Sequence, residues 1–321
     1  MRQEERKAFR FQMNKLALGV LIYNVIMSMV IIADTMVRTI IIMITVEGER
    51  KQELLMDRMI EQLTNSGWSS IFGVTVGILF LLLFFYREHL TKIMFWKSHK
   101  MTVKAFFMIL SVFMSAQIVF SFVAGCSEMI LNVFGYTMLG EIESASAQST
   151  TVSMFLYACI VAPVGEELVY RGFVLRFLQR YGKVFAIIVS SILFGVMHGN
   201  LIQAMFAFSI GLVLGYVATE YSIKWSIFLH FLNNCIFGDL LSYVLSWAPE
   251  AVQNGISNGI MLVFFVAGLI IIIYKHREIG QYIRENKSLG KFYLHALTAI
   301  WMIVFIVIEI GMGISGIERL S

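Results

Sequence analysis

The length of its apolar segments constrains this chain more than any other feature. Residues 16–46 are mainly apolar, and Asp34 and Arg38 are their only charged residues. As a helix rising about 1.5 Å per residue, this run is longer than a hydrocarbon core of about 30 Å. Only 14% of all residues are charged, against about 25% in a soluble domain. Because such a chain cannot bury its apolar surface by folding on itself, we predict an integral membrane protein.

Three further features narrow the class of protein that the sequence allows. Cys126, Cys159 and Cys235 lie in apolar surroundings and are too few to indicate a disulfide framework. The first apolar run is longer than the hydrophobic part of a signal peptide, and no small-residue cleavage site follows it. The net charge of +4 matters only through its distribution among the loops. We therefore expect the lipid bilayer, and no nucleic acid, as a partner.

The apolar runs predict an all-α polytopic transmembrane helix bundle of about eight to nine spans with interfacial amphipathic helices. Residues 47–66 mix charges with apolar residues at helical spacing, which is typical of an interfacial helix. The chain forms one integral membrane domain, 1–321, with N-terminal spans in 1–149, a motif-bearing core in 150–245 and C-terminal spans in 246–321. The predicted spans are residues 16–46, 71–86, 106–123, a segment from about 150, 184–198, 201–219, 225–245, 260–274 and 292–312.

Most of the 25 lysines and arginines fall in alternate connections between these spans. They lie in residues 1–15 and in the expected loops 87–104, 171–183, 219–224 and 275–291. Basic residues near span ends are retained on the cytoplasmic side. The bias therefore predicts a cytoplasmic N-terminus, and we expect the protein in the cell membrane.

Few strongly polar side chains remain within the predicted spans. An ionisable side chain in lipid is costly, and only another span can provide its partner. We therefore expect these side chains to converge at one depth. They are Glu166, Glu167 and Arg171 on the fourth span, His198 at the end of the fifth, and His230 and Asn234 on the seventh.

Helix geometry separates the two glutamates. Glu167 and Arg171 are four residues apart, so they can form an ion pair along one helix face. Glu166 lies about 100° further around the helix and is free to face a cavity. Pro163 and Gly165 can loosen the helix just before it, which would let water or backbone approach.

A free carboxylate, two imidazoles and an amide form a set suited to hydrolysis. Glu166 can take a proton from water, and a histidine can hold that water or pass the proton on. His230 and Asn234 share a helix face and can donate hydrogen bonds to the oxyanion of a tetrahedral intermediate.

The three motifs Glu-Glu-x-x-x-Arg, Phe-x-x-x-His and His-x-x-x-Asn, in this order within residues 163–234, resemble those of the CPBP family. That family contains type II CAAX prenyl-protein endopeptidases and bacteriocin-processing or bacteriocin-immunity proteins. The resemblance implies an intramembrane endopeptidase that cleaves a peptide or membrane-protein substrate near the membrane interface with a glutamate-activated water. The implied roles are general base for Glu166, water activation for His198, oxyanion hole for His230 and Asn234, and support of the site for Glu167 and Arg171.

Several alternatives remain open. A non-catalytic scaffold or bacteriocin-immunity protein of the same family would bind a partner membrane protein, and its activity would survive Glu166→Ala. A transporter would use the same groups to relay protons. We expect no cofactor, but Glu166, His198 and His230 can also supply three ligands to a zinc ion. The substrate of such an enzyme need not be prenylated.

Overall fold

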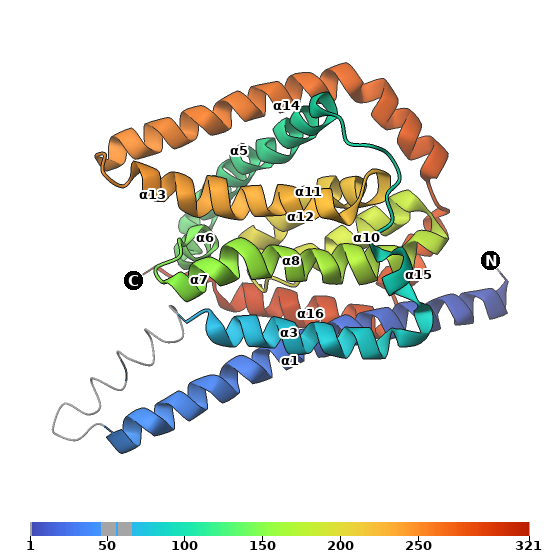
Figure 1. Cartoon of the computed structure of the whole chain (residues 1–321), viewed down its shortest axis with the longest axis horizontal. Helices are drawn as coiled ribbons and strands as arrows, with labels where there is room; N and C mark the ends of the chain where they lie inside the picture. Colours follow the sequence, from blue (N-terminus) through green and yellow to red (C-terminus); the bar gives the residue numbers. More distant parts are fainter. Residues whose placement is uncertain (1, 46–55, 57–65, 321) are drawn as a thin grey trace.

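The computed structural model describes residues 2–45, 56 and 66–320. Nearly all of the described residues are helical, and most of the longer helices lie alongside one another in one bundle (Figure 1). The longer helices are α1 (Gln3–Thr45), α3 (Trp68–Phe84), α5 (Val103–Val133), α10 (Lys183–Val196), α11 (Leu201–Glu220), α12 (Ile223–Phe231), α14 (Glu250–Asn286) and α16 (Ile300–Ser315).

Shorter elements connect or continue these helices. The short α-helices are α4 (Leu90–Met94), α6 (Leu139–Ser146), α7 (Val152–Leu156), α8 (Ala162–Glu167), α9 (Arg176–Leu178), α13 (Leu241–Leu245) and α15 (Gly290–Leu297). The 3-10 turns are Tyr86–Glu88 and Gln179–Tyr181, and the π-helical segments are Tyr157–Val161, Leu168–Leu175 and Leu232–Leu240. Strands β1 (Tyr136–Thr137) and β2 (Glu318–Arg319) form one antiparallel pair, with Tyr136 opposite Arg319.

The prediction of an all-α membrane bundle is confirmed, and its span count is approximate. Within the described residues, six helices are long and apolar enough to cross a bilayer. The number is seven if α15 and α16, bent by 66° at their junction, form one span. Helices α3 and α10 correspond to two further predicted spans, but they have only 17 and 14 residues. The interfacial helix predicted at 47–66 lies almost entirely outside the described residues.

A helix from Val152 to Tyr181 runs through the middle of the bundle. The sequence predicted a loop at 171–183, which is wrong, because the helix continues to Tyr181 and both Arg171 and Arg176 are buried. Arg176 stays inside because its guanidinium donates to the Ala218 carbonyl at 3.0 Å. A buried guanidinium needs such acceptors, and the neighbouring helix α11 supplies them.

Tight turns at two glycines set the direction of α10. Gly182 has a φ of 127°, and a Cβ there would lie 2.1 Å from the Ser288 hydroxyl, so a larger residue does not fit. Gly199, with a φ of 57°, reverses the chain again after α10. The Asn200 side chain then caps α11 by accepting a hydrogen bond from the Gln203 N–H at 2.8 Å. Helix α10 therefore lies between the Val152–Tyr181 helix and α11, against both of them.

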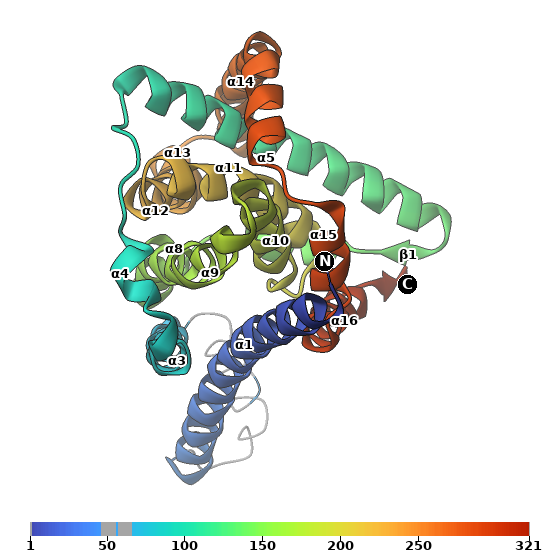
Figure 2. The same ribbon diagram turned by 90° about the vertical axis from the view of Figure 1, so that its right-hand side faces the viewer.

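Two groups of outer helices flank this centre (Figure 2). Helix α1 packs against α3 and α16 on one side, and α5 packs against α14 on the other. Asp34 and Arg38 on α1 form the ion pair that their spacing predicts, with 2.8 Å between Oδ2 and Nε. The termini of the chain therefore bring α1 and α16 together beside the centre.

Candidate active site

The helix that carries the two glutamates is interrupted by π-helical turns on either side of them. The Ala162 N–H donates to the Tyr157 carbonyl, five residues earlier. In that register the next donor would be residue 163, but Pro163 has no N–H. The Ala158 carbonyl is instead bonded by the Asn234 side-chain amide, with 3.1 Å between Nδ2 and the oxygen. The proline thus leaves a backbone acceptor for Asn234, a residue of the third motif.

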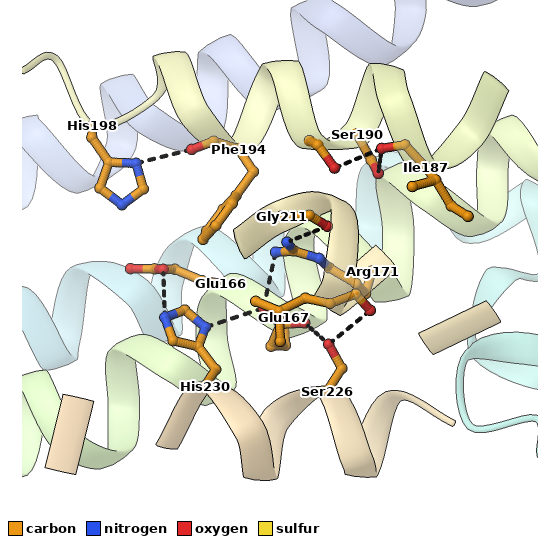
Figure 3. A network of polar contacts seen from close by, with 12 residues as sticks. Glu166, Glu167, Arg171, Ile187, Ser190, Phe194, His198, Gly211, Ser226 and His230 are labelled. Atoms are coloured by element: carbon orange, nitrogen blue, oxygen red, sulfur yellow. Dashed lines mark hydrogen bonds and ion pairs between the residues drawn. The ribbon is translucent and has the colours of Figure 1, made fainter. Parts of the chain in front are cut away.

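Glu167 is at the centre of a buried polar network (Figure 3). Its side chain is 0% exposed, and its Oε1 accepts a hydrogen bond from Arg171 Nη1 at 2.9 Å. The same oxygen lies 3.1 Å from His230 Nδ1, and Oε2 accepts a short hydrogen bond from the Ser226 hydroxyl. The pairing of Glu167 with Arg171 that their spacing predicts is therefore present, and it extends to α12.

Arg171 connects this network to α10 and α11. Its Nη2 donates to the Gly211 carbonyl at 3.3 Å, and its guanidinium lies 4.1 Å from the centre of the Phe194 ring. The Phe194 ring also makes edge contacts with the rings of His198 and His230, at 5.2 and 5.8 Å between centroids. Phe194 thus packs against the Arg171 guanidinium and against both histidine rings.

Glu166 faces away from this network into a cavity of about 420 Å³. Its side chain is 17% exposed, and its Oε2 lies 3.7 Å from His230 Nε2. His198 and Asn234 line the same cavity. The structure therefore brings four of the six side chains for which the sequence predicted a common depth into one cavity. It leaves Glu166 accessible and Glu167 enclosed.

The hydrogen bonds of the two histidines fix which ring nitrogen faces the cavity. His198 Nδ1 lies 2.9 Å from the Phe194 carbonyl oxygen. A carbonyl only accepts, so Nδ1 carries the hydrogen and Nε2 is left for a ligand. Likewise, His230 Nδ1 lies on the Glu167 carboxylate, and its Nε2 points toward Glu166. Both rings thus present Nε2 beside the accessible carboxylate.

Asn234 is more constrained than the sequence indicated. One of its amide hydrogens is committed to the Ala158 carbonyl, and its Oδ1 accepts from Asn233 Nδ2 at 2.9 Å. Asn233 Oδ1 in turn accepts from Gln117 Nε2 at 2.7 Å. An amide has two N–H donors, so Asn234 retains one for a ligand in the cavity.

Some residues of the cavity were missed by sequence reasoning. Tyr23 and Asn24 from α1 and Glu309 from α16 line it, although both helices lie outside the three motifs. Glu309 had a usable signal, because it is a lone acid in an apolar run and the rule that singled out Glu166 applies to it equally. Ser226 carried no such signal, since a serine in a span is common.

The three side chains that the sequence offered as zinc ligands, Glu166, His198 and His230, all line the cavity. Among the described residues, no group of three or more His, Cys, Asp or Glu side chains is arranged to hold a metal ion. His230 Nδ1 is engaged by Glu167, which leaves one nitrogen of each ring near Glu166. The site is accordingly built around one carboxylate and two oriented imidazoles.

One comparison with known proteins found a match. Residues 148–236 match the family model described as type II CAAX prenyl endopeptidase Rce1-like. This segment contains all three motifs and much of the cavity wall. No curated protein and no solved structure matches the chain. The match to residues 148–236 supports the resemblance of this part of the chain to the CPBP family of intramembrane proteases.

Proposed function

We propose that this protein is an intramembrane endopeptidase in which Glu166 activates a water for attack on a peptide bond. The proposal rests on the different surroundings of two adjacent carboxylates. Glu167 is enclosed and paired with Arg171, while Glu166 opens into the cavity. A general base must be accessible and must not be neutralised by a permanent partner. Of the two, only Glu166 meets both conditions.

The proposed reaction uses the cavity side chains in sequence. The water oxygen bonds to the substrate carbonyl carbon while its proton goes to Glu166, and His198 Nε2 holds the water in line. The remaining N–H of Asn234, together with His230 Nε2 in the protonated state of its ring, donates to the oxyanion. The C–N bond then breaks, and Glu166 returns its proton to the leaving amine.

The supporting network acts through position. Glu167 fixes His230 Nδ1, and Arg171 with Ser226 fixes Glu167. A shift of about 1 Å in a reacting group can cost about 100-fold in rate. We propose that Glu167 and Arg171 hold the catalytic side chains in position.

The substrate is proposed as a peptide or membrane protein cut near the membrane interface, with no requirement for a prenyl group. We propose that the protein lies in the cell membrane with its N-terminus on the cytoplasmic side. No cofactor is proposed, although hydrogen bonds at Nδ1 leave each Nε2 free for a metal ion as well as for water in the metal-free form. In that form, activity is unchanged by a strong chelator. Loss of activity in the chelator followed by recovery with Zn²⁺ would instead assign a metal to Glu166, His198 and His230.

The test compares cells carrying the wild type with cells carrying Glu166→Ala. We expect peptides in the membrane and secreted fractions that depend on Glu166, and a purified Glu166→Ala protein with about 10²–10⁴-fold lower peptidase activity. Its thermal unfolding is expected to match the wild type closely, because Glu166 lines the cavity and its nearest charged partner, His230, is 3.7 Å away. Cleavage that persists in Glu166→Ala would overturn the mechanism. A biological activity that persists without cleavage would favour the scaffold or immunity alternative.

A further inference from the structure

A second carboxylate, outside the matched segment, reaches the same cavity. Glu309 lies on α16 and lines the cavity together with Glu166 and His198. Its Oε2 is 3.8 Å from the position that a Cβ on Gly199 would occupy, so it lies beside the turn that follows His198. Helix α16 reaches this position because it packs against both α1 and α10.

Glu309 is buried, and only one of its two carboxylate oxygens has a hydrogen-bond partner among the described residues. The residue is 2% exposed, and its Oε1 accepts a hydrogen bond from Asn24 Nδ2 at 2.6 Å. Its Oε2 is enclosed and has no hydrogen-bond partner among the described residues. A buried polar atom without a partner costs about 1–3 kcal/mol, and a carboxylate within an apolar span is costlier still. A purely structural role would be served by bonding both oxygens, so the unused oxygen indicates a partner that arrives from the cavity.

The cavity wall indicates the charge of that partner. Its described lining contains Glu166 and Glu309 as acids but neither lysine nor arginine. Arg171, the cation of the first motif, has a side chain that is 0% exposed and already paired with Glu167. Apart from the imidazoles of His198 and His230, which serve the reaction at Glu166, a substrate carboxylate would meet like charges without a compensating lysine or arginine. A cation or a group rich in N–H donors would instead supply the partner that Glu309 Oε2 lacks.

We propose that Glu309 is a specificity-determining residue that binds a basic side chain of the substrate close to the scissile bond. The inference rests on the proposed peptidase function and adds a substrate class to it: apolar segments that carry an arginine or lysine. The guanidinium or ammonium would donate to Oε2 while Asn24 holds Oε1. A buried charge-assisted bond of this kind is consistent with about 10–100-fold discrimination over a neutral residue of the same shape.

The test uses two matched peptide series. Each is an apolar peptide of ten residues in which one arginine, or in the second series one citrulline, occupies each position in turn. Citrulline has nearly the shape of arginine without its charge. For the wild type we expect kcat/KM to favour arginine by about 10–100-fold at one position. Glu309→Gln is expected to reduce this ratio to about 1 while still cleaving the citrulline peptide. Glu318→Gln, the same change at an exposed site on β2, should leave the ratio unchanged.

A binding measurement separates this proposal from the peptidase function. Fluorescent versions of the two best peptides are titrated into the purified Glu166→Ala protein, with and without Glu309→Gln. Tighter binding of the arginine peptide that disappears with Glu309→Gln supports the proposal even if no peptide is cleaved. Equal binding of both peptides to Glu166→Ala, or an arginine preference that survives Glu309→Gln, overturns it. In either case the cleavage result for Glu166 stands on its own.

Discussion

Glu166 and Glu167 are adjacent in the chain, yet their surroundings differ almost completely. Glu167 is enclosed by a guanidinium, an imidazole and a hydroxyl, and Glu166 opens into the cavity. A rotation of about 100° per residue around one helix is enough to place the two carboxylates in different environments. At the scale of single residues, the site thus depends on keeping Glu167 fully paired.

Glu167→Gln should destabilise the protein as well as slow it. The change leaves the Arg171 guanidinium buried without a counter-charge, which costs about 3–5 kcal/mol. We expect a lower yield and a clearly lower thermal midpoint in detergent, measured with a fluorescent thiol dye or by light scattering. Removing both charges with Glu167→Gln and Arg171→Met should restore much of the midpoint but little of the activity, because His230 has lost its charged acceptor. An unchanged thermal midpoint in the Glu167→Gln variant would contradict the supporting role that we assign to Glu167.

At the scale of elements, the π-helical turns around Pro163 link the helix of the first motif to the helix of the third. Pro163 leaves the Ala158 carbonyl without a helical donor, and Asn234 bonds to it. A π-helical turn in a long helix often marks a functional site. The irregular backbone is tolerated here because a neighbouring span satisfies it.

Pro163→Ala should therefore reduce activity without reducing stability. The new N–H can donate within the helix and compete with Asn234 for backbone oxygens, which shifts the amide of Asn234 in the cavity. We expect kcat to fall by about 10-fold or more, with a thermal midpoint equal to or above that of the wild type. Unchanged kcat would show that the carbonyl bond does not position Asn234.

A second contact between elements lies near the basic ends of the helices. Glu88 bonds Lys15 of α1 at 2.8 Å and Arg180 at 3.1 Å. Burial raises the pKa of Glu88, but its bonds to these two cations outweigh burial and hold the pKa below its ordinary value of 4.5. The carboxylate therefore stabilises the fold above that value, and this contribution is lost as the pH falls through the lowered pKa.

Glu88→Gln should cost about 1 kcal/mol near neutral pH, since both pairs are partly exposed. The difference in thermal midpoint between wild type and variant should be largest at neutral pH and should shrink as the pH falls below 4.5. Midpoints measured across this pH range test the sign directly. A difference that grows in acid would contradict the assigned ion pairs.

At the scale of the whole molecule, the helices at the two ends of the chain complete the cavity. Helices α1 and α16 contribute Tyr23, Asn24 and Glu309 to a cavity whose other groups come from the middle of the sequence. The basic connections, where Lys15, Glu88 and Arg180 meet, lie at one end of the bundle. The cytoplasmic orientation of the N-terminus rests on the distribution of basic residues and stays a prediction.

Reporter fusions test that orientation. Alkaline phosphatase is active only outside the cytoplasm, so a fusion in the acidic stretch 139–149 is expected to be active. A fusion in the basic stretch 97–102 is expected to be inactive, and a fluorescent protein there should be bright. The reverse pattern would invert the orientation, although the cavity would be unaffected.

The sequence by itself determined the membrane class, the helical content and which polar groups are costly in lipid. These features follow from local chemistry, because the length of an apolar run and the spacing of residues along one helix do not depend on contacts with other segments. The pairing of Glu167 with Arg171 and of Asp34 with Arg38 belongs to this class. The same local reasoning placed a loop at 171–183, where the helix in fact continues.

Only the tertiary structure decided which groups share the cavity and which are already occupied. Asn234 bonds to Ala158, Ser226 to Glu167 and Asn24 to Glu309 across separate helices, and no spacing rule within one segment reaches such pairs. Helix packing also brought Glu309 to the cavity from the far end of the chain. Contacts between distant segments depend on the whole bundle closing around its buried charges, so they appear only when every partner is in place.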